Sequence, residues 1–309
     1  MTVSQDRTLG AHLSRKLLPL ILLTACLSQQ AIAQTIRGDA ASVEFDTALE
    51  VASSLPRLYS LLISLNGDLV VEEYFNGKGP STIANVKSVS KSVISALIGI
   101  AIEAGHINGV EQPIADFFGD ELAESDRMKS GIRVEDLLTM QSGLETTSNR
   151  NYGSWVMSRD WVGFALDQPV EYPPGSLMVY STGNTHLLSA ILTRATGRST
   201  WAFARDTLGE PLGFSLAQWP RDPQGIFFGG NDMEFTPRQM VAIGELYLNE
   251  GRADNRQVIP AEWIESSLEP RAVSTRESGR YYGYGWWIRE MAGHMTPYAW
   301  GYGGQFIVL

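Results

Sequence analysis

A serine and a lysine three residues apart, Ser88 and Lys91, open the most apolar long segment of the chain. A spacing of three places both side chains on one face of a helix. A serine hydroxyl needs a neighbouring base before it can attack a carbonyl carbon, and a lysine amine can be that base when burial lowers its pKa. The pair therefore predicts a nucleophile and its base, and the helix N-terminus adds a field that stabilises a developing alkoxide.

The segment that positions this pair, residues 88–104, is apolar on nearly every face after its first turn. Such a segment predicts a buried helix, and Gly105 is a suitable residue to end it. A Ser-x-x-Lys spacing also arises by chance in many sequences. Lys91 differs from an ordinary surface lysine because a charge inside an apolar helix is costly unless it has a role.

A tyrosine supplies the second group that could handle protons. Tyr180 precedes a predicted helix that ends near Gly197, and it follows a break at residues 173–175. At such a junction a phenol can point into a cleft, share protons with Ser88 and Lys91, and protonate a leaving group. The structural alternative is a core tyrosine bonded to a backbone carbonyl.

Glycines interrupt the last apolar segment, where residues 300–305 read Trp-Gly-Tyr-Gly-Gly-Gln. Glycine inside a strand is typical of close approach by a ligand, and a strand edge can offer a backbone N–H to an oxyanion. The structural alternative is a bulge that eases packing.

The order of elements predicts an α+β fold. The helices expected after residue 104 cover 133–140, 185–195, 237–251 and 260–267, and the strands cover 59–65, 69–75, 281–288 and 298–309. We expect a sheet domain from residues 34–105 plus 260–309, with a mostly helical domain, 106–259, inserted. The last strand stops at Leu309, so the sheet domain is expected to be truncated and the 309-residue chain to aggregate.

Composition excludes several function classes. The formal net charge is -10, which disfavours a nucleic-acid partner. Cys26 is the only cysteine, so we expect no intramolecular disulfide, no catalytic cysteine and no cysteine-based metal site. The four histidines lack metal-ligand spacing, although His186 could lie behind the site, and no Gly-x-Ser-x-Gly elbow is present.

The N-terminus predicts export. Arg15 and Lys16 precede a short apolar run at 17–23, which is typical of a signal peptide over residues 1–33. Two processing signals compete: a small-x-small site at 31–33, which we favour, and a lipobox that would acylate Cys26. The first predicts a periplasmic or secreted protein, and the second an outer-membrane lipoprotein with a lipid anchor.

Taken together, Ser88-Val-Ser-Lys91, Tyr180-Ser-Thr182 and the glycine segment resemble the three motifs of the serine β-lactamase and penicillin-binding superfamily. Segments 136–144 and 229–237 also resemble this group, and its class C-like members, the carboxylesterases and 6-aminohexanoate-dimer hydrolases, look most similar. The resemblance runs from about residue 55 to the end. It implies a β-lactamase/transpeptidase-like fold, an antiparallel sheet flanked by helices with an inserted helical domain.

The resemblance also implies the roles of the site residues. Ser88 attacks the carbonyl, Lys91 accepts its proton, and Tyr180 protonates the leaving group. The backbone N–H groups of Ser88 and Tyr302 hold the oxyanion, and water then releases the acyl group with the help of Lys91 and Tyr180. No metal and no cofactor are implied.

Two departures from the family pattern bear on the substrate. Thr182 stands where the family has an asparagine, and Ala299-Trp300-Gly301 stands where it has Lys-Thr-Gly or a histidine variant. The cation that grips a β-lactam carboxylate is missing. The sequence therefore favours a small ester or linear amide substrate, with Trp300 as an apolar wall.

The further candidates for substrate contact are Gly301, Gly303, Thr182 and Asp160, the last for a cationic group. Two alternatives stay open: a β-lactamase or D,D-peptidase, and a catalytically silent binding or sensor module on the same fold. The sequence leaves the oligomeric state undecided.

Overall fold

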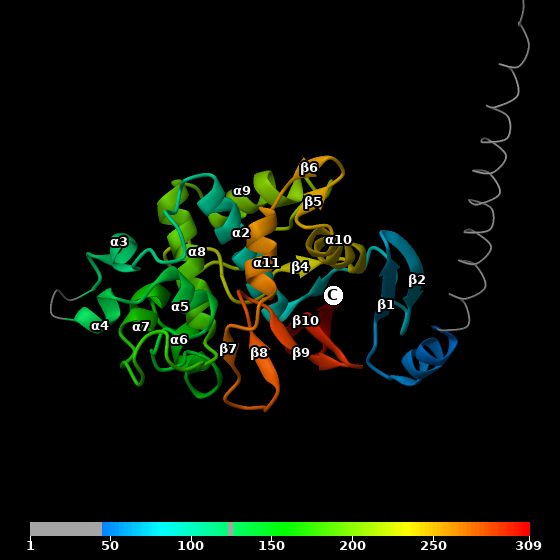
Figure 1. Ribbon diagram of the computed structural model, residues 1–309, viewed down its shortest axis with the longest axis horizontal. Helices are drawn as coiled ribbons and strands as arrows, with labels where there is room; N and C mark the ends of the chain where they lie inside the picture. The colour runs from blue at the N-terminus through cyan, green and yellow to red at the C-terminus, as the bar shows by residue number, and fades with distance from the viewer. Residues whose placement is uncertain (1–44, 123–125) are drawn as a thin grey trace, which may run out of the picture.

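The computed structural model describes residues 45–122 and 126–309, which form a five-stranded sheet, a mostly helical half and a separate hairpin (Figure 1). The predicted leader, with Cys26, lies outside the described residues. Within the described ranges, no helix combines the length and apolar character needed to cross a bilayer.

The strands fall at both ends of the described chain, with short pairs between them. They are β1 (Ser60–Leu65), β2 (Asp68–Tyr74), β3 (Ala84–Asn85), β4 (Glu234–Phe235), β5 (Arg252–Ala253), β6 (Arg256–Gln257), β7 (Ala272–Val273), β8 (Arg280–Tyr282), β9 (Trp287–Met291), β10 (His294–Gly301) and β11 (Gln305–Val308). β1 and β2 confirm the predicted hairpin, with Leu65 opposite Asp68.

The helices fill the middle of the chain, after a helix over 45–54. They are α2 (Ser90–Glu103), α3 (Ala115–Phe118), α4 (Arg127–Ser130), α5 (Val134–Leu138), α6 (Tyr152–Val156), α7 (Trp161–Leu166), α8 (Thr182–Thr196), α9 (Thr200–Ala204), α10 (Pro237–Leu248) and α11 (Ala261–Leu268), with 3₁₀ turns η1 (Lys87–Val89) and η2 (Asn149–Asn151) and a π-helical turn η3 (Arg205–Gly209). The five helices predicted from the sequence are confirmed as η1–α2, α5, α8, α10 and α11.

The main sheet has the order β11-β10-β9-β8-β7, and its neighbouring strands are antiparallel. The two long strands predicted at 281–288 and 298–309 are wrong as single strands, because each contains a tight turn. Residues 283–286 separate β8 from β9, and residues 302–304 separate β10 from β11. Aromatic residues flank both turns and conceal them, whereas the positive-φ glycines Gly285, Gly303 and Gly304 mark them.

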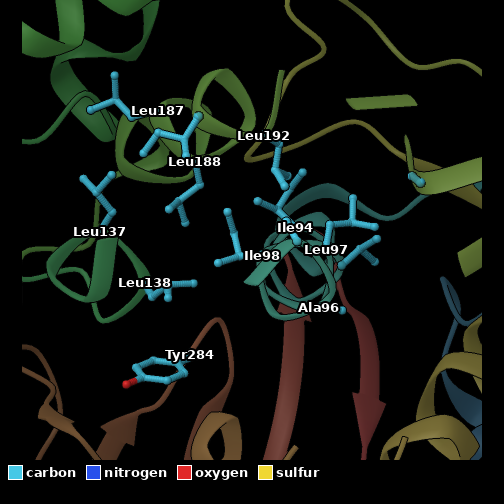
Figure 2. Close-up of a cluster of buried hydrophobic side chains, with 14 of the residues drawn as sticks. Ile94, Ala96, Leu97, Ile98, Leu137, Leu138, Leu187, Leu188, Leu192 and Tyr284 are labelled. Atoms are coloured by element: carbon cyan, nitrogen blue, oxygen red, sulfur yellow. The ribbon is translucent and has the colours of Figure 1, made fainter. Parts of the chain in front are cut away.

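The helix that carries the nucleophile segment, α2, lies at the centre of the hydrophobic core. Figure 2 shows Ile94, Leu97 and Ile98 of α2 among leucines of α5 and α8, with Tyr284 below Leu138. One core cluster runs from Val86 to Ile307, so both halves of the predicted domain division contribute to it. That division stays a prediction.

A pair of two-residue strands brings distant segments together beside α2. Ala84 pairs with Phe235 and Asn85 with Glu234, and the Val86 N–H donates to the Met233 carbonyl at 2.9 Å. This pairing places residues 229–233 next to the start of η1, where Ser88 lies.

Candidate active site

Ser88 and Lys91 lie together at the start of the central helix. Ser88 is in η1, Lys91 is in the first turn of α2, and Lys91 Nζ is 3.1 Å from Ser88 Oγ. Ser88 is partly exposed, while Lys91 is only 1% exposed. The predicted nucleophile is therefore reachable from solvent, and the predicted base lies behind it.

The Lys91 amine is bonded to neutral groups. It donates to the Gly230 carbonyl at 2.5 Å and lies 3.5 Å from Thr182 Oγ1. Burial lowers the pKa of Lys91 to about 7, and the negative charge of Asp232 opposes this shift. A substantial share of Lys91 is then neutral near pH 7, as a proton acceptor requires.

The close approach of Gly230 to Lys91 depends on its lacking a side chain. A Cβ at this position would lie 2.4 Å from Thr182 Cγ2 and 2.9 Å from the Thr182 carbonyl oxygen. Contacts this short do not occur, so any larger residue would push the segment away from α8. Glycine here lets a backbone carbonyl reach the buried lysine.

Tyr180 precedes α8 and faces the same amine. Lys91 Nζ lies 5.2 Å from the centre of its ring, and the ring stacks on Trp287 at 5.4 Å. Burial raises the pKa of Tyr180 to about 12, against the opposing effects of Ser88 and Arg276. The phenol is therefore protonated at neutral pH, and it can donate a proton to a leaving group.

Asn231 is a site residue that the sequence analysis missed. Ser88 Oγ donates to Asn231 Oδ1 at 3.1 Å, and Asn231 Nδ2 points to the Tyr152 hydroxyl at 3.4 Å. The resemblance singled out segment 229–237, but only the pairing of β3 with β4 shows that this asparagine reaches the nucleophile.

Asp232, the residue after Asn231, forms a polar cluster with Asn85 and Lys87 at the start of η1. Asp232 Oδ1 accepts from Asn85 Nδ2 and from Lys87 Nζ, each at 2.9 Å. Lys87 and Asp232 both have left-handed backbones, with φ of 51° and 68°. The cluster connects residues 85–87, which precede Ser88, to the segment that carries Asn231 and Asp232.

The predicted oxyanion groups lie on two elements that are in contact. Ser88 is in the first turn of η1, where backbone N–H groups lack intrahelical acceptors. Tyr302 follows Gly301 at the end of β10, and a Cβ on Gly301 would lie 2.3 Å from the Val86 carbonyl oxygen. Tyr302 is 88% exposed, and the role of its backbone N–H in holding the oxyanion stays a prediction.

An aromatic strip extends from Tyr180 along one face of the sheet. The ring centres of Trp287 and Trp300 are 6.4 Å apart, and Trp300 stacks on Phe306 with ring centres 6.2 Å apart. The Arg280 guanidinium lies 5.4 Å from both tryptophan rings. Trp300 is 39% exposed, as an apolar substrate wall requires.

The structure gives the surroundings of three predicted substrate contacts. Thr182 is buried behind Lys91, where its hydroxyl contacts Ser148 Oγ at 2.9 Å. Gly303 lies in the exposed turn between β10 and β11. Asp160 caps α7, and its Oδ1 accepts from the Gly163 N–H at 2.8 Å.

A substitution of Asp160 can distinguish its role as the cap of α7 from the predicted role in substrate binding. We expect Asp160→Ala to lower the free energy of unfolding by about 1 kcal/mol, because α7 loses its N-cap. Hydrolysis of both neutral and cationic substrates should be unchanged. Chemical denaturation and kcat/KM measure the two effects, and a selective loss of cationic substrates would instead restore the binding role.

His186 is buried away from the nucleophile. Its Nε2 contacts Asp222 Oδ2 at 3.0 Å, and its Nδ1 accepts from the Gly229 N–H at 3.4 Å. It therefore supports the segment that carries Gly230 and Asn231. Across residues 45–122 and 126–309, no three His, Cys, Asp or Glu side chains are grouped as metal ligands would be.

Comparison with known proteins gives a family match and a curated relative. The family model described as Beta-lactamase matches residues 59–309. A 6-aminohexanoate-dimer hydrolase of Paenarthrobacter ureafaciens is 26% identical over 228 residues, 66% of this chain and 55% of that protein. The chain thus spans about half the length of this curated relative.

Two solved structures have the same fold. The octameric penicillin-binding protein homologue from Pyrococcus abyssi aligns with a TM-score of 0.68 at 19% identity, over 88% of this chain and 70% of its own. EstCE1, described as a hydrolase with promiscuous acyltransferase activity, aligns with a TM-score of 0.65 at 16% identity, over 89% of each chain.

Proposed function

This chain belongs to the beta-lactamase family, and from that premise and the site geometry we propose that it is a serine hydrolase acting through an acyl-enzyme at Ser88. The contact between Ser88 Oγ and the buried Lys91 amine, at 3.1 Å, carries the proposal. A lysine that is 1% exposed and bonded to neutral groups is a suitable proton acceptor.

In the acylation step, Ser88 Oγ bonds to the carbonyl carbon while its proton passes to neutral Lys91. The negative charge on the carbonyl oxygen is held by the backbone N–H groups of Ser88 and Tyr302. As the bond to the leaving group breaks, Tyr180 gives its proton to the departing oxygen or nitrogen. The Lys91 proton then restores the phenol.

In the deacylation step, water attacks the acyl carbon and gives its proton to the Lys91–Tyr180 pair. The ester bond to Ser88 breaks, and the serine oxygen regains a proton from the same pair. The two steps consume one water and leave every side chain as it began.

The substrate class we propose is a small ester or a linear amide. Ala299, which is buried, stands where the family motif has its cation, and its neighbour Trp300 is partly exposed, which supports a neutral or apolar substrate group. The relative from Paenarthrobacter ureafaciens is named a 6-aminohexanoate-dimer hydrolase, and EstCE1 is described as a hydrolase with promiscuous acyltransferase activity, which supports transfer of an acyl group to water.

Turnover measurements test this proposal. We expect hydrolysis of short-chain p-nitrophenyl esters, with little turnover of nitrocefin, because Ala299 replaces the cation of the third motif. Rapid nitrocefin hydrolysis would favour the β-lactamase alternative. A protein that reacts covalently at Ser88 but turns over neither substrate would favour the silent binding module.

Export belongs to the same proposal. Residues 1–33 have the charge and apolar pattern of a leader, and either processing signal would deliver the hydrolase outside the cytoplasm. Intact mass of the processed protein distinguishes cleavage after Ala33 from acylation at Cys26.

A further inference from the structure

The Ser88 hydroxyl has two partners that compete for its proton. Ser88 Oγ lies 3.1 Å from Lys91 Nζ and also 3.1 Å from Asn231 Oδ1. A charged ammonium group can only donate, so Ser88 must then send its proton to another acceptor. When Lys91 is neutral, its lone pair can accept the Ser88 proton instead.

We propose that Asn231 is a working member of the site: its amide oxygen accepts the Ser88 proton whenever Lys91 is charged, and it thereby decides how readily Lys91 loses its own proton. The arrangement with charged lysine has both hydrogen bonds in sequence, from Lys91 to Ser88 and from Ser88 to Asn231. When neutral Lys91 keeps its two N–H groups on Gly230 and Thr182 and accepts the Ser88 proton, the second bond is given up. Asn231 therefore favours the charged form and opposes the effect of burial.

The surroundings of Asn231 fit this role. Tyr152, which is partly buried, lies against its Nδ2 and leaves the amide oxygen directed at Ser88. The amide itself is uncharged, so it adds no attraction beyond its hydrogen bond. A carboxylate of the same shape would add a full negative charge next to Ser88 and Lys91.

The other charged and titratable groups near Lys91 are few in the described part of the chain. Asp232, bonded to Lys87, acts from the segment between α8 and α10. Tyr180 acts from the start of α8, and Arg276 lies beyond it in the β7–β8 loop. A substitution at residue 231 leaves the identity of all these groups unchanged.

The test is the titration of Lys91 in the free protein, followed by NMR of lysine labelled with ¹³C at Cε. The chain has five lysines, and Lys91→Arg identifies the Lys91 signal. We expect Asn231→Leu to lower the midpoint by about half a pH unit, because the Ser88 proton loses its alternative acceptor. Asn231→Asp should raise it by about one unit or more, because of the added charge.

Three further variants sharpen the result. Tyr152→Phe removes the hydroxyl that contacts Asn231 Nδ2 but keeps Asn231 itself. We therefore expect the Lys91 midpoint to move in the same direction as in Asn231→Leu, but by less. Asn249→Leu and Asn249→Asp make the same changes at an exposed residue that follows α10, and they should leave Lys91 unmoved.

Opposite shifts in the two Asn231 variants support the proposal, and the acidic limb of kcat/KM should follow them. An unchanged midpoint in folded variants, or shifts of the same sign, would overturn it. The inference rests on the proposed roles of Ser88 and Lys91. Because the titration needs no substrate, its outcome is independent of whether hydrolysis is found.

Discussion

Replacement of Ser88 by alanine should abolish covalent labelling by a fluorophosphonate and lower ester hydrolysis by about 10³-fold or more. In the described part of the chain, the buried amine of Lys91 bonds to Ser88, Thr182 and Gly230, and Ser88 is the only serine among these partners. Alanine removes the attacking oxygen, and the oxyanion groups that remain cannot replace it. Intact mass after labelling reads the adduct directly.

A matched control separates loss of the nucleophile from loss of the fold. Ser90 lies two residues further on, is buried, and donates to the Lys87 carbonyl. Ser90→Ala should keep the labelling while costing some stability. Labelling that persists in Ser88→Ala at full stoichiometry would place the nucleophile elsewhere.

Replacement of Lys91 by methionine should lower activity to a similar degree while making the protein more stable at acidic pH. Methionine fills much of the same space without a charge. The pKa of Lys91 is about 7 in the folded protein and 10.5 as its ordinary value. The wild type therefore bears a penalty for burying the ammonium, at most about 5 kcal/mol below pH 7.

The sign of the pH dependence follows from proton binding. Between pH 7 and 10.5 the unfolded chain holds the Lys91 proton and the folded chain does not, so wild-type stability rises with pH in this window. Lys91→Met should lack this rise. The difference in melting temperature between the two proteins should be largest near pH 6 and should shrink towards pH 9.

Activity of the wild type should show the same ionisation. The rate kcat/KM is expected to rise through an acidic limb near pH 7 as Lys91 becomes neutral. Parallel stability curves for the two proteins, together with a flat acidic limb, would show that Lys91 is not the group that titrates.

The sequence predicted the parts of the site that follow local rules. Helical spacing joined Ser88 to Lys91, and the apolar segment around them predicted the burial that lowers the lysine pKa. The helix predicted from residue 237 is found as α10, where Thr236 is the N-cap and Pro237 the first residue, a feature that depends only on neighbouring residues.

The parts that failed depend on the path of the chain in space. Asn231 reaches Ser88 only because the short strands β3 and β4 pair, and two-residue strands leave no periodic pattern. Asp160, predicted as a substrate contact, also caps α7, a structural role that the sequence reading did not weigh. The turns at 283–286 and 302–304 were hidden by the aromatic residues on both sides.

The contacts of Ser88 and Lys91 also bear on how the protein folds. The residues that meet there are separated along the chain by 91, 139 and 143 positions. Such non-local contacts form late in folding, because long loops must close first. During synthesis, Ser88 also leaves the ribosome well before Asn231 does. Reactivity of Ser88 towards an acylating probe should therefore be one of the last properties to return on refolding, and its recovery can time the closure of the fold.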